Sequence, residues 1–196
     1  MRKDDFGDNA EMISDETKDY IKKFFKKGKL VCLTGAGISA ESGIPTFRGK
    51  GGLWEKYDPE KYANTEGLAS IFKTQPQKLA DFIVDFYSVL LSARPNLAHF
   101  ALSVLEKEDI LSSVITQNID NLHQEAGTRS IIELHGNAFR IRCMGCAKTI
   151  TLERDRLKEM IELLKINRSS RIKLLRVLSR YFPRCICGAR YRIDIV

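Results

Sequence analysis

The run LVCLTGAG at residues 30–37 constrains the fold more than any other stretch of this sequence. Its apolar and β-branched residues end at a pair of glycines, which is typical of a strand buried on both faces of a parallel sheet. Gly35, Gly37 and Ala40 fit the spacing G-x-G-x-x-A, which lets the backbone approach a pyrophosphate at the start of a helix. Because short glycine turns also serve as plain strand–helix connections, the motif alone leaves both interpretations open.

A second buried strand is predicted at residues 112–118, where SSVITQN is followed by IDNLH. The carboxyl ends of neighbouring parallel strands meet at one edge of the sheet, and ligands bind there. Gln117, Asn118 and Asp120 would lie at this edge, where their amide and carboxylate groups can bind sugar hydroxyls or a carboxamide. The alternative is an N-capped turn, in which Asp120 caps the next helix, and it accounts for one residue of the three.

Helical periodicity and short apolar runs predict the remaining elements. The predicted helices cover residues 14–28, 76–92 and 97–105, and the predicted short strands are IIELHG at 131–136 and FRIRC at 139–143, on either side of a glycine turn.

The chain has three histidines, of which His135 is the candidate for chemistry. His99 and His123 fall in predicted helices and are interpreted as structural. His135 lies between an apolar strand and a glycine. A lone histidine is most often a hydrogen-bonded core residue, but an imidazole at this place could also act as a general base near neutral pH.

Four of the five cysteines form two close pairs that are far apart in the sequence. Cys143 and Cys146 are spaced as Cys-x-x-Cys, and Cys185 and Cys187 as Cys-x-Cys. In a reducing compartment such pairs indicate metal chelation rather than disulfides. Cys32 lies in the first predicted strand and is interpreted as a small core residue.

The net charge of +7 is concentrated in one segment. Residues 147–184 contain eleven Lys and Arg against four Asp and Glu, and the rest of the chain is neutral. This excess indicates a surface for an acidic partner or nucleic acid, and the alternative is a solvated helical face. The segment predicts a helical hairpin with one apolar face made by Leu157, Ile161 and Leu164, and the other by Ile172, Leu175, Leu178 and Phe182.

The motifs taken together resemble one known family, the sirtuins, which are NAD-dependent protein-lysine deacylases. The resemblance rests on GAGISAESGIPTFRG at 35–49, TQNIDNLHQEAG at 116–127, ELHG at 133–136 and the paired cysteines. It implies an α/β fold with a Rossmann-like parallel sheet and a small zinc-binding module that carries an inserted helical hairpin. The implied organisation is a tail and helix at 1–28, an NAD-binding part at 29–140, a zinc module at 141–190 with its helical insertion at about 152–182, and a return strand at 191–196.

The resemblance also implies a role for each site residue. The expected reaction transfers the acyl group of a protein lysine to ADP-ribose and releases nicotinamide, with His135 as the base on a ribose hydroxyl. By position in the motifs, the NAD diphosphate would be held by Gly35, Ala36, Gly37 and Ala40. Phe47 would shield the reactive ribose carbon, and Arg48 would bind phosphate or ribose oxygens. Gln117 would bind the ribose, Asn118 would orient a ribose hydroxyl or water, and Asp120 would bind the carboxamide. The four cysteines would hold a structural zinc, although Cys-x-Cys is one residue shorter than the usual second pair.

Two further departures from the family pattern lead to further expectations. After CGARYRIDIV at 187–196, the later strands of the family's catalytic domain are missing, which predicts an incomplete sheet: either the chain is a fragment or truncated gene product, or another chain completes the sheet. Ile83 and Phe86 stand where succinyl- and malonyl-preferring members carry Tyr and Arg, which predicts a preference for uncharged acyl groups.

The alternatives to a deacylase are a non-catalytic remnant that binds partners through its zinc and helical parts, and a mono-ADP-ribosyltransferase. The acid-rich start and the absence of a long apolar stretch predict a cytoplasmic or nuclear protein without a membrane partner.

Overall fold

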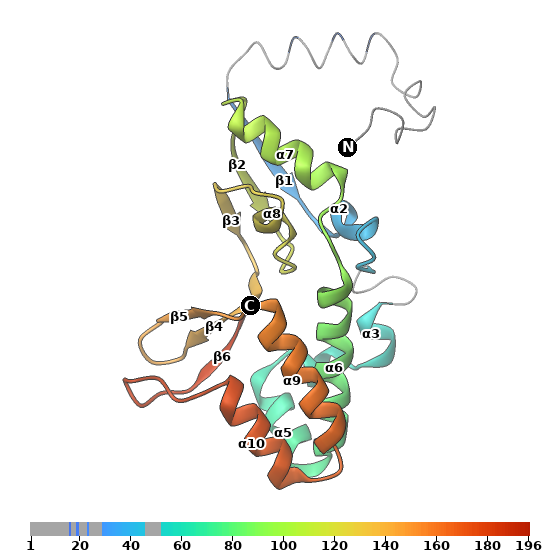
Figure 1. The fold of residues 1–196 in the computed structure, drawn as a ribbon, viewed down its shortest axis with the longest axis vertical. Coiled ribbons are helices and arrows are strands. Elements are labelled where there is room, and N and C mark those ends of the chain that lie inside the picture. Colours follow the sequence, from blue (N-terminus) through green and yellow to red (C-terminus); the bar gives the residue numbers. More distant parts are fainter. Residues whose placement is uncertain (1–15, 17–18, 20–22, 24–28, 46–51) are drawn as a thin grey trace.

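The computed structural model describes residues 16, 19, 23, 29–45 and 52–196, so most of the helix predicted at 14–28 lies outside the described residues. Its first sheet contains β1 (Leu30–Thr34), β2 (Leu111–Thr116) and β3 (Ile131–Glu133) in the order β1-β2-β3. Both strand pairs are parallel (Figure 1). The predicted α/β class and parallel sheet are therefore confirmed.

Only one face of this sheet is covered by helices in the described part of the chain. Side chains on neighbouring strands share a face when their residues are in register, and Cys32, Val114 and Ile131 are aligned in this way. This face packs against α7 (Leu97–Lys107), which contacts β2, and α8 (Leu122–Glu125), which contacts α7.

The opposite face of the sheet is open to solvent. Val31 and Leu33 of β1 are 57% and 65% exposed, and Ile132 of β3 is 52% exposed. The prediction that β1 is buried on both faces is therefore wrong for the described structure. The physical reason is that a parallel strand is buried on both faces only when helices lie on both sides of its sheet.

The long helix α6 (Pro76–Ser92) connects the two halves of the molecule (Figure 1). It packs against α5 (Thr65–Thr74) and against both helices of a hairpin, α9 (Arg154–Asn167) and α10 (Arg171–Tyr181). Tyr87 of α6 is fully buried, and its hydroxyl donates a 2.9 Å hydrogen bond to the carbonyl of Ala138 in the second sheet. Within the described residues, no helix is both long and apolar enough to cross a bilayer.

The second sheet is antiparallel and contains β4 (Gly136–Cys143), β5 (Thr149–Thr151) and β6 (Tyr191–Ile195) in the order β5-β4-β6. Strands were predicted at both 131–136 and 139–143, but β3 and β4 belong to different sheets and do not form a hairpin. Gly136 at the junction has φ +78°, and a Cβ atom there would lie 1.9 Å from the carbonyl oxygen of Asp194. Glycine is required because β6 passes directly against this junction.

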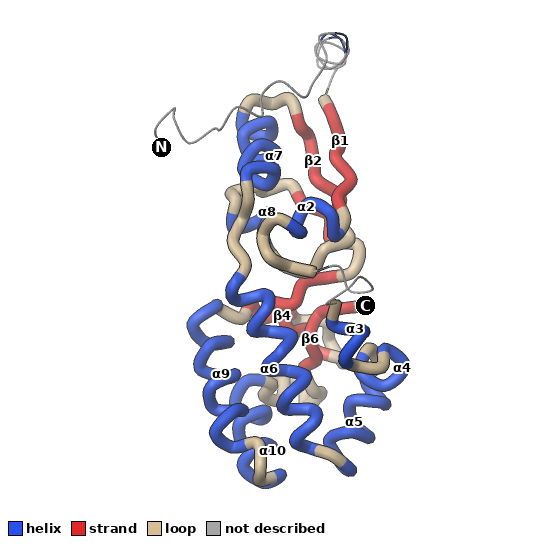
Figure 2. The backbone as a smooth tube through the Cα atoms, turned by 90° about the vertical axis from the view of Figure 1, so that its right-hand side faces the viewer, coloured by secondary structure: helices blue, strands red, loops and turns tan. Residues whose placement is uncertain are grey.

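The helical hairpin forms as expected, but one of its apolar faces differs from the prediction (Figure 2). Leu157, Ile161 and Leu164 of α9 are buried as predicted. On α10 the buried residues are Leu174, Val177 and Tyr181, while Ile172 and Leu175 are 68% and 52% exposed. The sequence of α10 contains two apolar stripes, and the stripe that ends in the large aromatic ring of Tyr181 is the one that faces the core.

Two short helices, α3 (Leu53–Lys56) and α4 (Pro59–Tyr62), precede α5, and no helix was predicted for any of the three. The largest buried cluster lies between α6, the hairpin and the second sheet. A short helix, α2 (Ala36–Ala40), follows β1 directly, as predicted from the glycine turn.

Candidate functional site

The three parallel strands end at one edge of their sheet, and a polar or glycine residue lies within two positions of each end. Gly35 follows β1, Gln117 follows β2, and His135 lies two residues beyond β3. The backbone amide of Gln117 donates a 3.1 Å hydrogen bond to the carbonyl of Thr34, which joins the ends of β1 and β2. The structure therefore brings together the glycine turn, the polar segment at 117–120 and His135.

The glycine turn leaves open space where side chains would otherwise lie. Gly35 has extended backbone angles, with φ −140° and ψ −166°, and Gly37 lies in α2. A Cβ atom at either position would meet no atom within 4 Å. Neither the backbone conformation nor the packing of the described chain thus requires glycine here, and the free space suits a ligand that approaches the backbone closely.

Ser39 connects the glycine turn to the polar segment after β2. It is buried, and its hydroxyl donates a 2.6 Å hydrogen bond to Oδ2 of Asp120. The side-chain amide of Asn118 donates 3.0 Å hydrogen bonds to Ser39 Oγ and to the carbonyl of Gly35. These bonds hold α2 and the 117–120 segment in a fixed relation. Ser39 was not singled out in the sequence, although it lies inside the glycine motif.

Asp120 is buried, and both of its carboxylate oxygens accept hydrogen bonds from within the chain. Oδ2 accepts from Ser39, and Oδ1 accepts from the backbone amide of Leu122 at 3.0 Å. The N-cap residue of α8 is Asn121 rather than Asp120, although the Asp120 carboxylate does bind the first amide of that helix, and its predicted contact with a carboxamide stays a prediction. The side chain of Gln117 is exposed, and Oδ1 of Asn118 makes no hydrogen bond to the described residues.

Asn96 is a second residue that the sequence did not single out for the site. Its side-chain amide donates hydrogen bonds of 2.7 Å to the carbonyl of Ile38 and 3.0 Å to the hydroxyl of Ser42. Its side-chain oxygen caps α7 by accepting from the amides of Ala98 and His99. Asn96 thus fixes the loop after the glycine turn to the start of α7.

The ring of His135 is exposed, and among the described residues one hydrogen bond holds it. Its Nδ1 lies 3.0 Å from the carbonyl oxygen of Gln117. A carbonyl oxygen can only accept, so Nδ1 carries the hydrogen and Nε2 of the neutral ring is free to take a proton. This arrangement favours the general-base interpretation over that of a buried core histidine.

His99 and His123 are buried beneath the site, in agreement with their structural interpretation. Their ring centroids lie 4.9 Å apart, and Nε2 of His123 is 2.9 Å from the hydroxyl of Thr34. Burial lowers the pKa of His123 to about 4, with a further decrease from His99 and an opposing effect of Asp120. The His123 ring is therefore neutral near pH 7 and serves in packing rather than in proton transfer.

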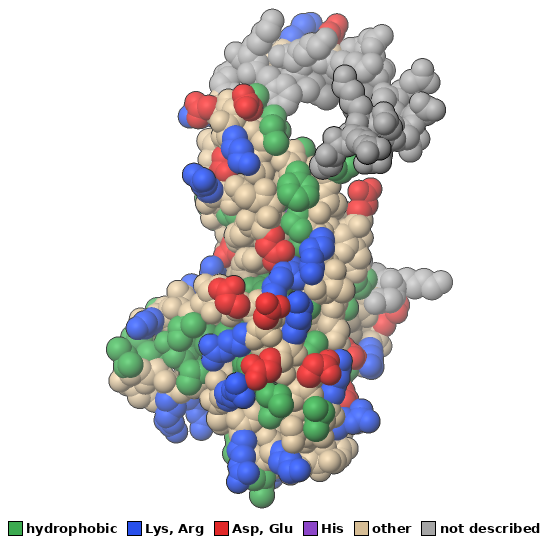
Figure 3. Space-filling model, in the orientation of Figure 1, with side chains coloured by type: hydrophobic (Ala, Val, Ile, Leu, Met, Phe, Trp, Pro, Cys, Tyr) green, Lys and Arg blue, Asp and Glu red, His purple; other side chains and the backbone are tan. Residues whose placement is uncertain are grey.

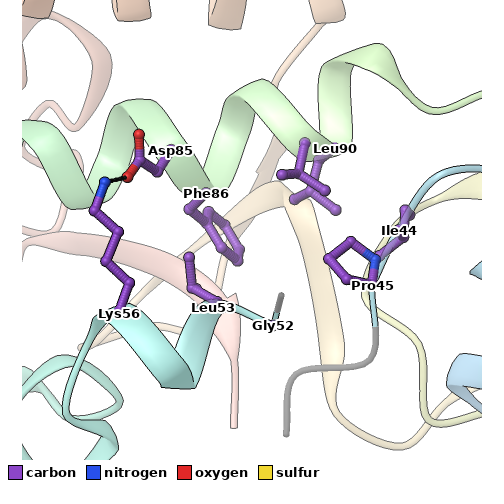
Figure 4. A pocket seen from close by; sticks show the side chains of 9 residues that line it. Ile44, Pro45, Gly52, Leu53, Lys56, Asp85, Phe86 and Leu90 are labelled. Atoms are coloured by element: carbon purple, nitrogen blue, oxygen red, sulfur yellow. Dashed lines mark hydrogen bonds and ion pairs between the residues drawn. The ribbon is translucent and has the colours of Figure 1, made fainter. Parts of the chain in front are cut away.

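A cavity of about 180 Å³ lies beside the segment that follows the glycine turn (Figure 4). Apolar side chains of that segment, α3 and α6 line it, among them Ile44, Leu53 and Phe86. Lys56 and Asp85 form an ion pair at one end of the cavity. Phe47 and Arg48 lie in the segment 46–51, outside the described residues, so their predicted roles stay predictions.

The four paired cysteines lie together at the ends of β4 and β6. All four sulfur atoms lie within 4.8 Å of one another, with 3.4 Å between Cys143 and Cys187 and 3.6 Å between Cys146 and Cys185. Tetrahedral zinc with Zn–S bonds of about 2.3 Å places its sulfurs about 3.8 Å apart, so this set fits zinc. The shortened Cys-x-Cys pair therefore does not prevent the cluster from forming.

Three comparisons relate this arrangement to known proteins. The sequence profile of the Sir2 family matches residues 35–196. An NAD-dependent protein deacylase of Pyrococcus furiosus is 47% identical over 178 residues, and the match covers 90% of this chain and 63% of the relative. One from Pyrococcus abyssi is 46% identical, with 85% and 59% covered.

Solved structures show the same likeness. A Sir2 homologue mutant bound to ADP-ribose superimposes with a TM-score of 0.64 at 34% identity, covering 91% of this chain and 62% of that one. A Sir2 homologue–NAD complex gives 0.63 at 36% identity, with 91% and 60% covered. This chain thus spans about three fifths of the length of the relatives that it matches.

Proposed function

Because this chain belongs to the Sir2 family, we propose that it binds NAD and takes part in NAD-dependent deacylation of protein lysines. The observation that carries the proposal is the ring of His135, whose Nε2 is free to accept a proton at the sheet edge that also carries the glycine turn. The names of two relatives support the proposal, since both are NAD-dependent protein deacylases.

When bound, NAD would supply an ADP-ribosyl group that accepts the acyl group as nicotinamide leaves. We propose that His135 takes a proton from a ribose hydroxyl and that Asn118 orients this hydroxyl or a water through its Oδ1, which makes no hydrogen bond to the described residues. The open space at the glycine turn would admit the diphosphate. The proposed cofactor-binding residues are Gly35, Ala36, Gly37, Ala40, Phe47, Arg48, Gln117, Asn118 and Asp120.

The experiment that tests this function measures nicotinamide release from NAD with and without an acetyl-lysine peptide. A deacylase releases nicotinamide only when the peptide is present, because the acyl oxygen displaces it. A mono-ADP-ribosyltransferase would release nicotinamide with an unacetylated protein acceptor, and a non-catalytic remnant would release none. Either of these two results would contradict the proposal.

The cavity beside α6 leads to a prediction about acyl choice. Phe86 lines this cavity and Ile83 packs in the adjoining core. Both side chains are hydrocarbons, so neither can donate a hydrogen bond to an acyl carboxylate. Lys56 is already paired with Asp85. Since burying an unpaired carboxylate is costly, we expect kcat/KM for acetyl-lysine to exceed that for succinyl-lysine at least ~10-fold.

A matched variant sharpens this comparison of acyl groups. The double substitution Ile83→Tyr and Phe86→Arg should raise the rate with a succinyl-lysine peptide relative to acetyl-lysine, because Arg binds a carboxylate with two hydrogen bonds. Equal turnover of both peptides by the unaltered chain would show that the carboxylate finds another partner.

The basic hairpin presents two different surfaces. Cations of α9 are paired with acids, such as Lys158 with Asp155 at 2.8 Å and Lys165 with Glu162 at 2.6 Å. Helix α10 contains no acidic residue and exposes Ile172 and Leu175 between its cations. Figure 3 shows Lys and Arg side chains around this end of the molecule.

We propose an acidic protein surface as the partner of α10. Nucleic-acid backbones would use its cations but offer nothing to its exposed aliphatic side chains, whereas an acidic protein can contact both. Fluorescence anisotropy with an acidic amphipathic peptide and with duplex DNA compares the two classes, and tighter binding of DNA would contradict this choice.

We further propose that the four-cysteine cluster holds a structural zinc ion. Four thiolates without an open position are typical of sites that stabilise the fold rather than perform catalysis. Such a site needs reduced cysteines, so we place the chain in a reducing compartment, as the cytoplasm or nucleus is.

A further inference from the structure

Arg140 of β4 forms ion pairs with two carboxylates that come from different sheets. Its Nη2 atom lies 2.8 Å from Oε2 of Glu133, the last residue of β3. Its Nε atom donates a 2.6 Å hydrogen bond to Oδ2 of Asp194 in β6. Since β3 belongs to the parallel sheet and β6 to the antiparallel one, a single guanidinium group joins the two halves of the molecule where β3 leads into β4 (Figure 1).

Both carboxylates are largely withdrawn from solvent. The side chains of Glu133 and Asp194 are 11% and 6% exposed. Burial raises the pKa of Asp194, but hydrogen bonds from Arg142 and Arg140 outweigh this effect and lower the pKa below its ordinary value, so the carboxylate is charged near pH 7. Because a buried charge is costly unless it is paired, the arrangement of these strands depends on the cations between them.

Glu133 depends on Arg140 more than Asp194 does. Asp194 also accepts a 2.6 Å hydrogen bond from Nε of Arg142, and it keeps this cation when Arg140 is removed. The other partners of the Glu133 carboxylate among the described residues are two neutral side-chain amides, each at 2.6 Å, those of Gln124 and Asn137. An amide donates a hydrogen bond without cancelling the charge. Loss of the guanidinium group therefore leaves a buried carboxylate without a cation and draws Glu133 toward water.

His135 lies between the two strands that Arg140 joins. It follows Glu133 by two residues, and its carbonyl accepts a 3.2 Å hydrogen bond from the amide of Val196, just after β6. Its ring is exposed, so packing does not fix the orientation of the imidazole. The orientation depends on the hydrogen bond from Nδ1 to the carbonyl of Gln117, which forms only while the backbone at 133–136 keeps its place beside the end of β2.

We infer that Arg140 is a positioning residue for the ring of His135. Its guanidinium group holds the backbone on both sides of His135, through Glu133 before it and through β6 beside it. This keeps Nδ1 within hydrogen-bonding distance of the Gln117 carbonyl and leaves Nε2 as the proton acceptor. An imidazole in the wrong tautomer cannot accept a proton at the required atom. The consequence for catalysis rests on the proposed function, whereas the effect on the ring does not.

The test compares Arg140→Met with a matched substitution, Arg154→Met. Methionine keeps much of the length of the arginine side chain and removes its charge. Arg154 is 19% exposed and forms a 2.8 Å ion pair with Glu125, so it also joins α9 to the half that contains the parallel sheet. None of the hydrogen bonds that Arg154 makes to described residues reaches 133–136. The two variants thus lose a similar ion pair, but only one of them loses the contact beside His135.

The measurement is the tautomer of His135, read from the imidazole ¹⁵N chemical shifts of histidine-labelled chain at alkaline pH, where the ring is neutral. His135→Ala assigns the signals among the three histidines. The unaltered chain and Arg154→Met are expected to carry the hydrogen on Nδ1, and Arg140→Met should show a mixture of both tautomers. With NAD and acetyl-lysine peptide, kcat of Arg140→Met should fall roughly 10- to 100-fold while KM for NAD changes little.

An unchanged tautomer of His135 in Arg140→Met would overturn the inference. So would an equal change in Arg154→Met, because the ring would then respond to any loosening between the two halves. The double substitution Glu133→Gln and Arg140→Met removes the buried charge together with its cation, so it serves where Arg140→Met does not fold, and the same mixture of tautomers is expected. The tautomer is measured without NAD or turnover, so a chain that releases no nicotinamide would contradict the proposed function and leave this test intact.

Discussion

Replacing His135 by alanine is expected to lower acyl-lysine-dependent nicotinamide release by a factor of about 10² to 10⁴, which is the usual contribution of a general base. The expectation follows from the hydrogen bond between Nδ1 of His135 and the carbonyl of Gln117, which leaves Nε2 as the proton acceptor. The measurement is the rate of nicotinamide release at saturating NAD and acetyl-lysine peptide, compared between the variant and the unaltered chain.

Two controls separate loss of the base from loss of the fold. The ring of His135 is exposed, so the variant should keep the melting temperature of the unaltered chain. Its affinity for NAD, measured by isothermal titration, should also change little, because the base acts on the reaction and not on cofactor binding. A variant that keeps its full rate would show that another group accepts the proton.

Much of the parallel sheet and the long helix α6 could be predicted because the relevant signals are local. The apolar run at β1 ends in glycines, and α6 begins at Pro76 in its first turn and extends to Ser92, as the periodicity predicted. The open face of β1 could not be predicted from its own residues. An apolar strand has the same sequence pattern whether or not another element covers it.

The same distinction between local and distant signals applies to α10. Its sequence offers two apolar stripes of similar spacing, and the choice between them depends on α9 and α6, which pack against it. Leu174, Val177 and Tyr181 are buried because they face those helices. Helical periodicity alone cannot identify the partner that a stripe will face.

The candidate site was predicted to the extent that its residues belong to contiguous motifs. Gly35, Asn118 and His135 lie at one sheet edge because each follows a parallel strand. Ser39 and Asn96 were missed because their contacts join residues that are far apart, as in the Ser39–Asp120 bond across 81 positions. Such hydrogen bonds have no local sequence signature, although both residues lie within or next to recognisable motifs.

Zinc removal is expected to have the largest effect on stability. Purified chain should contain about one zinc per molecule, and a strong chelator or the substitution Cys185→Ser should unfold the second sheet. The cluster joins that sheet at two places, since Cys143 is the last residue of β4 and the amide of Met144 donates to the carbonyl of Arg190, just before β6. Structural zinc in small domains contributes about 10–16 kcal/mol, which equals or exceeds the roughly 5–15 kcal/mol by which domains are stable.

Cys32→Ser is the matched control for the zinc experiment. Cys32 lies in β1, in the other sheet, and is not among the four clustered cysteines. The Cys32→Ser variant should therefore retain about one zinc per chain and melt near the temperature of the unaltered protein. The Cys185→Ser variant should lose both the metal and the cooperative unfolding transition of the second sheet. Metal analysis and circular dichroism measure these two properties. Freshly purified chain that is folded but free of metal would contradict the zinc assignment. In that case the strand pairing of β4 with β6, together with the packing of α6, α9 and α10 around Tyr87, would have to stabilise this half of the molecule without the ion.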